Sequence, residues 1–337
     1  MLITEDLNEK LLTIKGKTIA IVYIFEGDNS SGFEHFYIWK SNIISLWLRA
    51  VQDLECLPLI IDVRTFVEKA INKTLPCIDY VLNLNSGTNN LSTMALVPAV
   101  CSSIGVPCIP CNATAIVTGE NKNLSNLIAN SIGLNVPKSL NINEPNGIFR
   151  PINLGNSLGV KRFYDSHIEG VYQEFIEGYD ITTPVVYNAI SNQMDVLPTV
   201  IYVPKSNDNT WFNSSNVKKT RSGYNLKTIK IDENLQQRYL DLVKALNIHT
   251  FCRIDARVKS NKVDGNIELA NFENTYFVEI NVMPTIREFN NFVFSYNSIE
   301  KSSLFHDYIG AYEKIYGKSN LNNFLLSSSI MSTKTMY

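Results

Sequence analysis

This sequence has no strong excess of charge of either sign. Its 337 residues hold 30 Lys and Arg against 32 Asp and Glu, which gives a net charge of −2. The one short basic run is Lys218, Lys219 and Arg221. Proteins that bind nucleic acids or anionic membranes usually carry longer basic runs or patches. We therefore expect neither nucleic acid nor membrane as a partner.

A secretory signal is also absent. Glu5, Asp6, Glu9 and Lys10 lie among scattered leucines, with no basic start before an apolar core. The segment 80–119 has no charged residue, but Asn, Gly and Pro residues interrupt it repeatedly. Buried strands and one packed helix are expected there, not a membrane span. A cytoplasmic location is the resulting expectation.

The cysteines lack the spacing of a disulfide scaffold. Six are present without a secretory signal, so reduced thiols in a cytosolic protein fit best. Cys108 and Cys111 form a C-x-x-C pair, but no second pair and no nearby histidine complete a zinc site, so both are expected to be structural. The four histidines are scattered, and no histidine-based metal site is expected.

Apolar residues are abundant, at 45% of a chain long enough for two or three domains. The first third alternates strand-like segments (17–25, 57–63, 80–84, 106–110) with helix-like segments (36–54, 66–71, 91–104). This alternation predicts an α/β domain with a mostly parallel sheet. Ligands bind beyond the carboxyl ends of such strands, so the polar segments 25–32 and 83–88 are candidate substrate walls.

The middle of the chain contains a Gly-rich segment. We expect a helix over 120–134, then strand, loop and strand over 147–162. Gly155 and Gly159 flank Asn156 and Ser157, and the N–H groups of such a loop can bind phosphates. An ordinary turn has the same composition. The polar segment 204–223 is either functional or simply solvated.

Two strands in the last third carry the most informative pattern. Alternation over 274–284 predicts Phe277, Glu279 and Asn281 on one face. Alternation over 251–259 puts Arg253 and Asp255 on one face. A buried carboxylate is costly unless it is paired or binds a metal. Each strand alone allows either explanation, but an arginine and three oxygen donors on neighbouring strands favour a Mg²⁺ site.

Helices are also expected over 233–246 and 302–316. The tail from Gly317 is rich in Asn and Ser and is expected to fray in part.

Taken in order, these motifs resemble the ATP-grasp ligases, and among them the D-alanine–D-alanine ligase branch. The resemblance runs from about Val106 to Tyr316 and is weaker before that. It rests on Gly105-Val-Pro, Lys122, Arg150-Pro, Gly155-Asn-Ser-Leu-Gly-Val, Glu174-Phe-Ile-Glu-Gly-x-Asp, Arg253-Ile-Asp and Glu279-Ile-Asn-x-x-Pro. It implies an α/β, ATP-grasp fold: an N-terminal parallel-sheet domain (1–113), then two α+β domains (114–172 and 173–337) that clamp ATP.

The resemblance implies that ATP is bound by Lys122, Arg150, Gly155, Gly159, Gln173, Glu174, Ile176 and Asp180. Lys122 and Arg150 would lie on the phosphates, although the family usually has lysine where Arg150 stands. Backbone groups of Glu174 and Ile176 would bind the adenine ring, Gln173 its exocyclic amine, and Asp180 the ribose.

The resemblance also implies two Mg²⁺ ions held by Asp255, Glu279 and Asn281, with Glu279 bridging them. Arg253 would stabilise the oxyanion of an acyl-phosphate and of its tetrahedral adduct. Lys218 or Lys219 would help close the site. The branch is usually dimeric, which implies a homodimer.

The substrate pockets depart from the family pattern. Asn156, followed by Ser157, stands where the family has a substrate-contacting serine, and Thr285 stands where it has glycine. Arg287 is either a clamp for a substrate carboxylate or a surface arginine. The candidate substrate residues are Glu34, Asn85, Thr285, Arg287 and Asn290.

The resemblance implies an ATP-dependent carboxylate–amine ligase that forms an amide through an acyl-phosphate, and the departures argue against D-alanyl-D-alanine as its product. Natural-product ligases, for example those that join an amino acid to a mycosporine core, fit such pockets. The alternatives are a D-alanine–D-alanine ligase and an ATP-binding protein without turnover. The sequence does not identify the acid, the amine, their stereochemistry or the closing-loop lysine.

Overall fold

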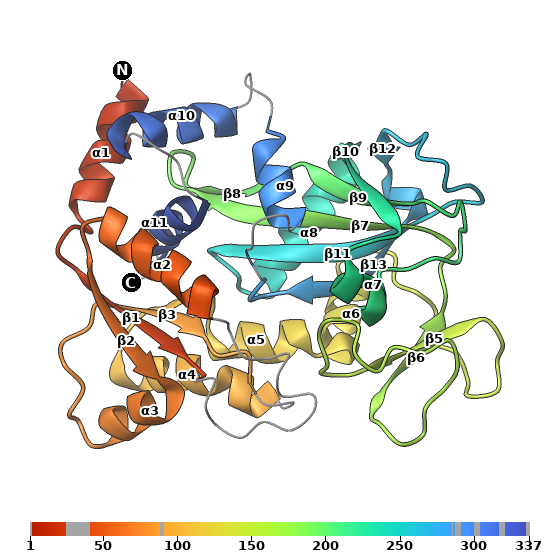
Figure 1. The fold of residues 1–337 in the computed structure, drawn as a ribbon, viewed down its shortest axis with the longest axis horizontal. Helices are drawn as coiled ribbons and strands as arrows, with labels where there is room; N and C mark the ends of the chain where they lie inside the picture. Colours follow the sequence, from red (N-terminus) through yellow and green to blue (C-terminus); the bar gives the residue numbers. More distant parts are fainter. Residues whose placement is uncertain are drawn as a thin grey trace.

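The computed structural model describes residues 2–24, 41–87, 91–284, 286, 291–299, 304–316 and 321–334. Its strands form three sheets, of four, two and seven strands. Figure 1 shows the four-stranded sheet and the two-stranded sheet at opposite ends of one side of the molecule, with the large sheet above them. None of the helices in these ranges is both long and apolar enough to cross a membrane.

The N-terminal sheet is parallel, as predicted. Its strands are β1 (Thr18–Tyr23), β2 (Leu57–Asp62), β3 (Tyr80–Leu84) and β4 (Cys108–Ile109), in the order β2-β1-β3-β4. Helices α1 (Leu2–Leu12), α2 (Ser41–Asp53), α3 (Val63–Ile71) and α4 (Leu91–Ile104) accompany them. All residues of β3 are buried, as expected for an inner strand of a covered parallel sheet.

The helix predicted over 120–134 forms as α6 (Lys122–Ser131), and a helix that was not predicted, α5 (Ala113–Glu120), precedes it. Asn121 separates them with extended backbone angles, and its side chain accepts hydrogen bonds from the N–H groups of Asn123 and Leu124. Asparagine stabilises a helix start in this way. The break brings Glu120 and Lys122 to the same point of the fold.

The two-stranded sheet consists of β5 (Gly147–Pro151) and β6 (Gly170–Glu174), paired antiparallel. The strand predicted after the Gly-rich loop does not form; only an isolated bridge joins Phe149 to Lys161. The predicted boundary at 172 falls within β6, and the division into three domains stays a prediction.

The large sheet is mostly antiparallel, in the order β12-β10-β9-β7-β11-β13, with β8 also paired to β7. Its strands are β7 (Gly178–Asn188), β8 (Gln193–Val196), β9 (Thr199–Pro204), β10 (Tyr224–Ile231), β11 (Phe251–Lys259), β12 (Leu269–Ala270) and β13 (Thr275–Asn281). A short helix, α7 (Ser215–Thr220), lies in the predicted polar loop. Helices α5, α6 and α8 (Glu233–Ala245) share one apolar core with the sheet, which leaves other side chains of β9, β10 and β11 to line a cleft.

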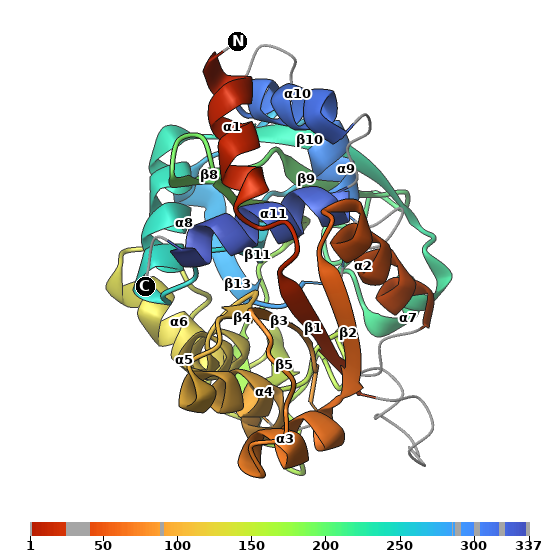
Figure 2. The same ribbon diagram turned by 90° about the vertical axis from the view of Figure 1, so that its left-hand side faces the viewer.

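The described part of the tail, which was expected to fray in part, is helical. Residues 321–334 form α11 (Leu321–Lys334), which packs against α2 and β7, and which lies inside the molecule in Figure 2. The ring of Phe324 packs against those of Tyr296 in α9 (Asn291–Asn297) and Tyr312 in α10 (Leu304–Tyr316). The serines are tolerated because they donate to carbonyl groups, as Ser329 does to Leu325.

Truncation of Phe324, which is fully buried, tests this packing. We expect Phe324→Ala to lower the free energy of unfolding by about 3–5 kcal/mol, because it leaves a cavity beside the rings of Tyr296 and Tyr312. Urea denaturation monitored by circular dichroism would measure it. Leu127→Ala is the control, because Leu127 is 60% exposed on α6. Equal effects of the two substitutions would mean that α11 contributes little to the core.

Candidate active site

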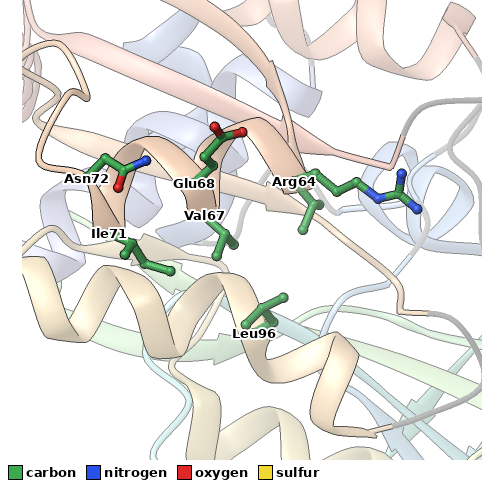
Figure 3. Close-up of a pocket in the computed structure, with 7 residues that line it drawn as sticks. Arg64, Val67, Glu68, Ile71, Asn72 and Leu96 are labelled. Atoms are coloured by element: carbon green, nitrogen blue, oxygen red, sulfur yellow. The ribbon is translucent and has the colours of Figure 1, made fainter.

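Two depressions in the described surface are candidates for a functional site. Figure 3 shows the first, of about 420 Å³, where Val67 and Ile71 of α3 lie opposite Leu96 of α4. The second is a cleft of about 800 Å³ bounded by the large sheet, the β5–β6 hairpin and the end of α5. We place the candidate site in the cleft, because buried charged groups converge there and the first depression is mainly apolar.

The floor of the cleft is formed by β11 and β13, which pair directly, as predicted. Arg253 lies opposite Asn281, and Asp255 lies opposite Glu279. The pairing shifts at the next position, where Ala256 lies opposite Phe277. This β-bulge corrects the predicted alternation: Phe277 is buried in the core while Glu279 lines the cleft.

Asp255 is held by several donors at once. Arg253 donates from Nε to Oδ1 at 3.0 Å and from a terminal nitrogen to Oδ2 at 2.9 Å. Thr182 Oγ1 lies 2.6 Å from Oδ1, and Asn281 Nδ2 lies 2.9 Å from Oδ2. The forked contact with arginine fixes the orientation of this carboxylate.

Glu279 is the most strongly charge-stabilised carboxylate of the cleft. Its Oε2 lies 3.5 Å from Lys122 Nζ. Burial by itself raises the pKa of Glu279, but the cationic groups of Lys122, Lys218, Arg150 and Arg253 lower it to about 2. Glu279 is therefore ionised at every physiological pH, although it is largely buried.

The donor set on these two strands fits a hard cation. Asp255 and Glu279 supply carboxylate oxygens, and Asn281 supplies an amide oxygen; such ligands suit Mg²⁺. No group of three or more His, Cys, Asp or Glu side chains suited to a metal occurs in the described parts of the chain. The candidate metal site therefore has two carboxylate ligands, Asp255 and Glu279, and one amide ligand, Asn281. The number of ions stays a prediction.

Lys122 reaches the cleft from the start of α6, and Arg150 reaches it from β5. Lys122 Nζ donates to the Leu154 carbonyl oxygen at 2.8 Å, which ties the base of the Gly-rich loop to the strand that carries Glu279. Arg150 donates to the Val278 carbonyl oxygen at 2.7 Å and to Gln173 Oε1 at 2.6 Å. Burial lowers the pKa of both cations.

Gln173 lies where the predicted adenine-binding segment begins, but its amide contacts protein groups. Its oxygen accepts from Arg150, and its nitrogen donates to the Pro137 carbonyl oxygen at 3.1 Å. In this structure Gln173 therefore positions Arg150, and its contact with an adenine amine stays a prediction. The Glu174 N–H likewise donates to the Lys138 carbonyl oxygen at 2.8 Å.

Arg257 organises the rest of that segment, and the sequence assigned it no role. It donates to the Ile176 and Gly178 carbonyl oxygens and, at 2.6 Å, to Asp180. Its guanidinium also lies 4.6 Å from the centre of the Phe175 ring. The alternation of β11 places Arg257 on the same face as Arg253 and Asp255, which was the available signal.

The Gly-rich loop lies over the cleft. Asn156 and Ser157 adopt left-handed φ angles of 55° and 57°, and Gly159 has φ 69°. A Cβ on Gly159 would lie 2.8 Å from Pro151, so glycine is needed there. Ser157 Oγ donates to the Asn213 carbonyl oxygen at 2.9 Å. The loop is thereby tied to the segment that leads into α7, which carries Lys218.

Both lysines of α7, Lys218 and Lys219, line the cleft. Burial lowers the pKa of Lys218, while Glu279 and Asp255 raise it. Carboxylates of both β11 and β13 thus influence Lys218, and which of the two lysines closes the site stays a prediction.

Of the five predicted substrate residues, the structure describes only Asn85. Asn85 is buried, donates to the Thr93 carbonyl oxygen at 2.6 Å and accepts from the Gly87 N–H at 3.1 Å. It shapes the turn after β3, and its neighbour Ser86 lines the cleft in its place. Four others lie outside the described residues: Glu34, Thr285, Arg287 and Asn290.

Glu120 is a cleft residue that the sequence did not reveal. It ends α5, and its Oε1 accepts from the Val282 N–H at 3.1 Å. Burial, together with Glu279, raises its pKa, and Lys122 and Arg253 only partly offset this, so the pKa is about 7. The burial of Glu120 results from packing of the end of α5 against β13, an element distant in the sequence.

The ionised form of Glu120 should destabilise the fold. Because its folded-state pKa of about 7 exceeds the ordinary glutamate value of 4.5, the cost is absent below about pH 4.5, grows up to about pH 7 and is full above it. We expect Glu120→Gln to raise the free energy of unfolding by about 1–3 kcal/mol at about pH 8.5, and by much less at about pH 5.

Urea denaturation of wild type and variant at both pH values measures this difference. Glu68→Gln, on the exposed face of α3, is the matched control and should change stability by less than about 0.5 kcal/mol. A gain of the same size at both pH values would show that ionisation of Glu120 is not its cause.

No family model matches this sequence, and no curated protein matches it. Solved structures do. The chain is similar to a D-alanine–D-alanine ligase from Bacillus anthracis complexed with ATP, with TM-score 0.57 and 18% identity over 95% of this chain and 100% of that one.

Two further ligases are similar to the chain. For D-alanyl-alanine synthetase A from Vibrio cholerae the TM-score is 0.58, with 13% identity over 90% of this chain and 99% of that one. For an L-amino acid ligase from Bacillus licheniformis the TM-score is 0.54, with 15% identity over 94% of this chain and 74% of that one. At sequence identities this low, the likeness to these structures shows only the fold. The chain has the ATP-grasp fold that its motifs predicted.

Proposed function

We propose that this protein is an ATP-dependent ligase that joins a carboxylate to an amine through an acyl-phosphate. The observation that carries the proposal is the convergence of Arg253, Asp255, Glu279 and Asn281 on one face of two paired strands. A protein that only bound ATP would have little need of a buried arginine aimed beside its metal ligands.

In this proposal the phosphates of ATP lie among Lys122, Arg150 and Lys218, three cations that line the cleft. The γ-phosphoryl group passes to a carboxylate oxygen of the acid, and ADP leaves. The amine nitrogen then attacks the acyl carbon, the bond to phosphate breaks, and the nitrogen loses a proton. Arg253, already held by Asp255, stabilises the oxyanion of that adduct.

Asp255, Glu279 and Asn281 would hold Mg²⁺, which when bound offsets the negative charge of the phosphates. The adenine would lie against the backbone of Glu174 and Ile176, with the ribose near Asp180. Arg257 supports this segment by donating to the carbonyl groups of Ile176 and Gly178. A homodimer in the cytoplasm stays a prediction, which sedimentation velocity and cell fractionation can test.

A panel of acids and amines, assayed by release of phosphate and formation of ADP, tests the proposed activity. We expect at least one pair to stimulate turnover, and Glu279→Gln to lower it by at least about 100-fold, because the variant removes a charged metal ligand. Glu68→Gln should leave turnover unchanged. A panel in which no pair stimulates phosphate release would overturn the proposal.

The panel also separates the alternatives. D-alanine offered as both acid and amine gives D-alanyl-D-alanine if the protein shares the activity named for several of its structural neighbours. Tight ATP binding in calorimetry without any ADP formation would instead indicate a protein that binds ATP without turnover. A natural-product ligase predicts activity with an acid other than D-alanine.

Removal of divalent cations is an independent test of the candidate metal site. We expect EDTA to abolish turnover and an excess of MgCl₂ to restore it, because two carboxylates and a polyphosphate repel one another without a cation. The measurement is the rate of phosphate release before and after each addition. Turnover that persists in EDTA would contradict the assignment of Asp255, Glu279 and Asn281 as metal ligands.

A further inference from the structure

Glu120 stands apart from the other charged groups of the cleft. The cations that influence it are held elsewhere: Arg253 by Asp255, and Lys122 by Leu154 and Glu279. Among the residues that the structure describes, no Lys or Arg forms an ion pair with Glu120, and its one bonded partner is the neutral Val282 N–H. This carboxylate can therefore accept a further donor.

The surroundings of Glu120 differ from the phosphate side of the cleft. Met283, directly after the residue that Glu120 contacts, accepts from Asn83 Nδ2 at 3.3 Å, so this wall is shared with the end of β3. Ser86 and Met94 line the cleft from the same N-terminal domain. All of these side chains are neutral, and Glu120 supplies the negative charge on this wall.

The close packing of α5 holds the carboxylate in place. A Cβ on Gly119 would lie 2.5 Å from a methyl group of Val282, so the end of α5 lies directly against the residues that follow β13. Asn121 ends the helix with its side chain capping α6. Glu120 is therefore presented from a rigid helix end, next to Arg253 and the metal-binding strands.

We propose that Glu120 binds the amine substrate through its ammonium group and holds that nitrogen beside the acyl-phosphate, which the nitrogen attacks after it loses a proton to solvent. The inference rests on the proposed ligase function and adds the substrate class: a primary amine that is cationic at neutral pH, such as the α-amino group of an amino acid. A fixed carboxylate attracts such a group, and the pairing offsets the cost of burying its charge. ATP and the acid are bound by other residues.

The test compares two nucleophiles at neutral pH with wild type, Glu120→Gln and Glu68→Gln. One is the amino acid that the panel identifies as the best amine. The other is hydroxylamine, which is mainly uncharged under these conditions and converts acyl-phosphates to hydroxamates. For Glu120→Gln we expect the KM of the amino acid to rise by about 10- to 100-fold. We expect hydroxamate formation and the KM for ATP to stay within about twofold of wild type.

The outcomes distinguish this inference from the proposed function. If wild type forms neither amide nor hydroxamate with any acid, the ligase function itself fails. If wild type is active and Glu120→Gln keeps the wild-type KM for the amino acid, the inference fails alone. It also fails if hydroxamate and amide formation fall equally, because Glu120 would then serve ATP, the acid or the fold. Glu68→Gln should match wild type throughout.

Discussion

The antiparallel pairing of β11 with β13 is the contact on which the site depends. It sets Arg253 opposite Asn281 and Asp255 opposite Glu279, so one register brings four functional side chains together. The bulge that follows allows Phe277 and Ile280 to stay in the core while Glu279 lines the cleft. With regular alternation, Phe277 and Glu279 would share a face, and either the core or the carboxylate would be misplaced.

Backbone carbonyl groups hold three of the cations of the cleft in place. Val278 accepts from Arg150, Leu154 from Lys122, and Ile176 with Gly178 from Arg257. These contacts orient the side chains before any ligand arrives, so less reorganisation is needed when a negative charge develops. Glu120 is different, because its charge is partly buried with a single neutral partner. A carboxylate in that position costs stability, which is consistent with a use in binding.

Much of the fold was predictable because it depends on local patterns. Alternating apolar strands and helices predicted the parallel N-terminal sheet, and the ordered motifs predicted the ATP-grasp fold. The errors have local causes that composition hides. Asn121 caps α6, so the predicted helix begins at Lys122 and not at Glu120, and serines of α11 donate to carbonyl groups, so a polar tail packs as core. Neither could be inferred without knowing which backbone groups remain unpaired.

The sequence by itself determined which residue types are available and in which order: Arg253-x-Asp255, Glu279-x-Asn281, and the lysines and glycines before them. These are properties of single strands and loops. Only the tertiary structure decided that Gln173 holds Arg150, that Arg257 holds the carbonyl groups of Ile176 and Gly178, and that Asn85 faces inward. The same holds for Glu120. Hydrogen-bond partners and burial arise between elements distant in the chain, and a carboxylate acquires an unusual pKa only where they meet.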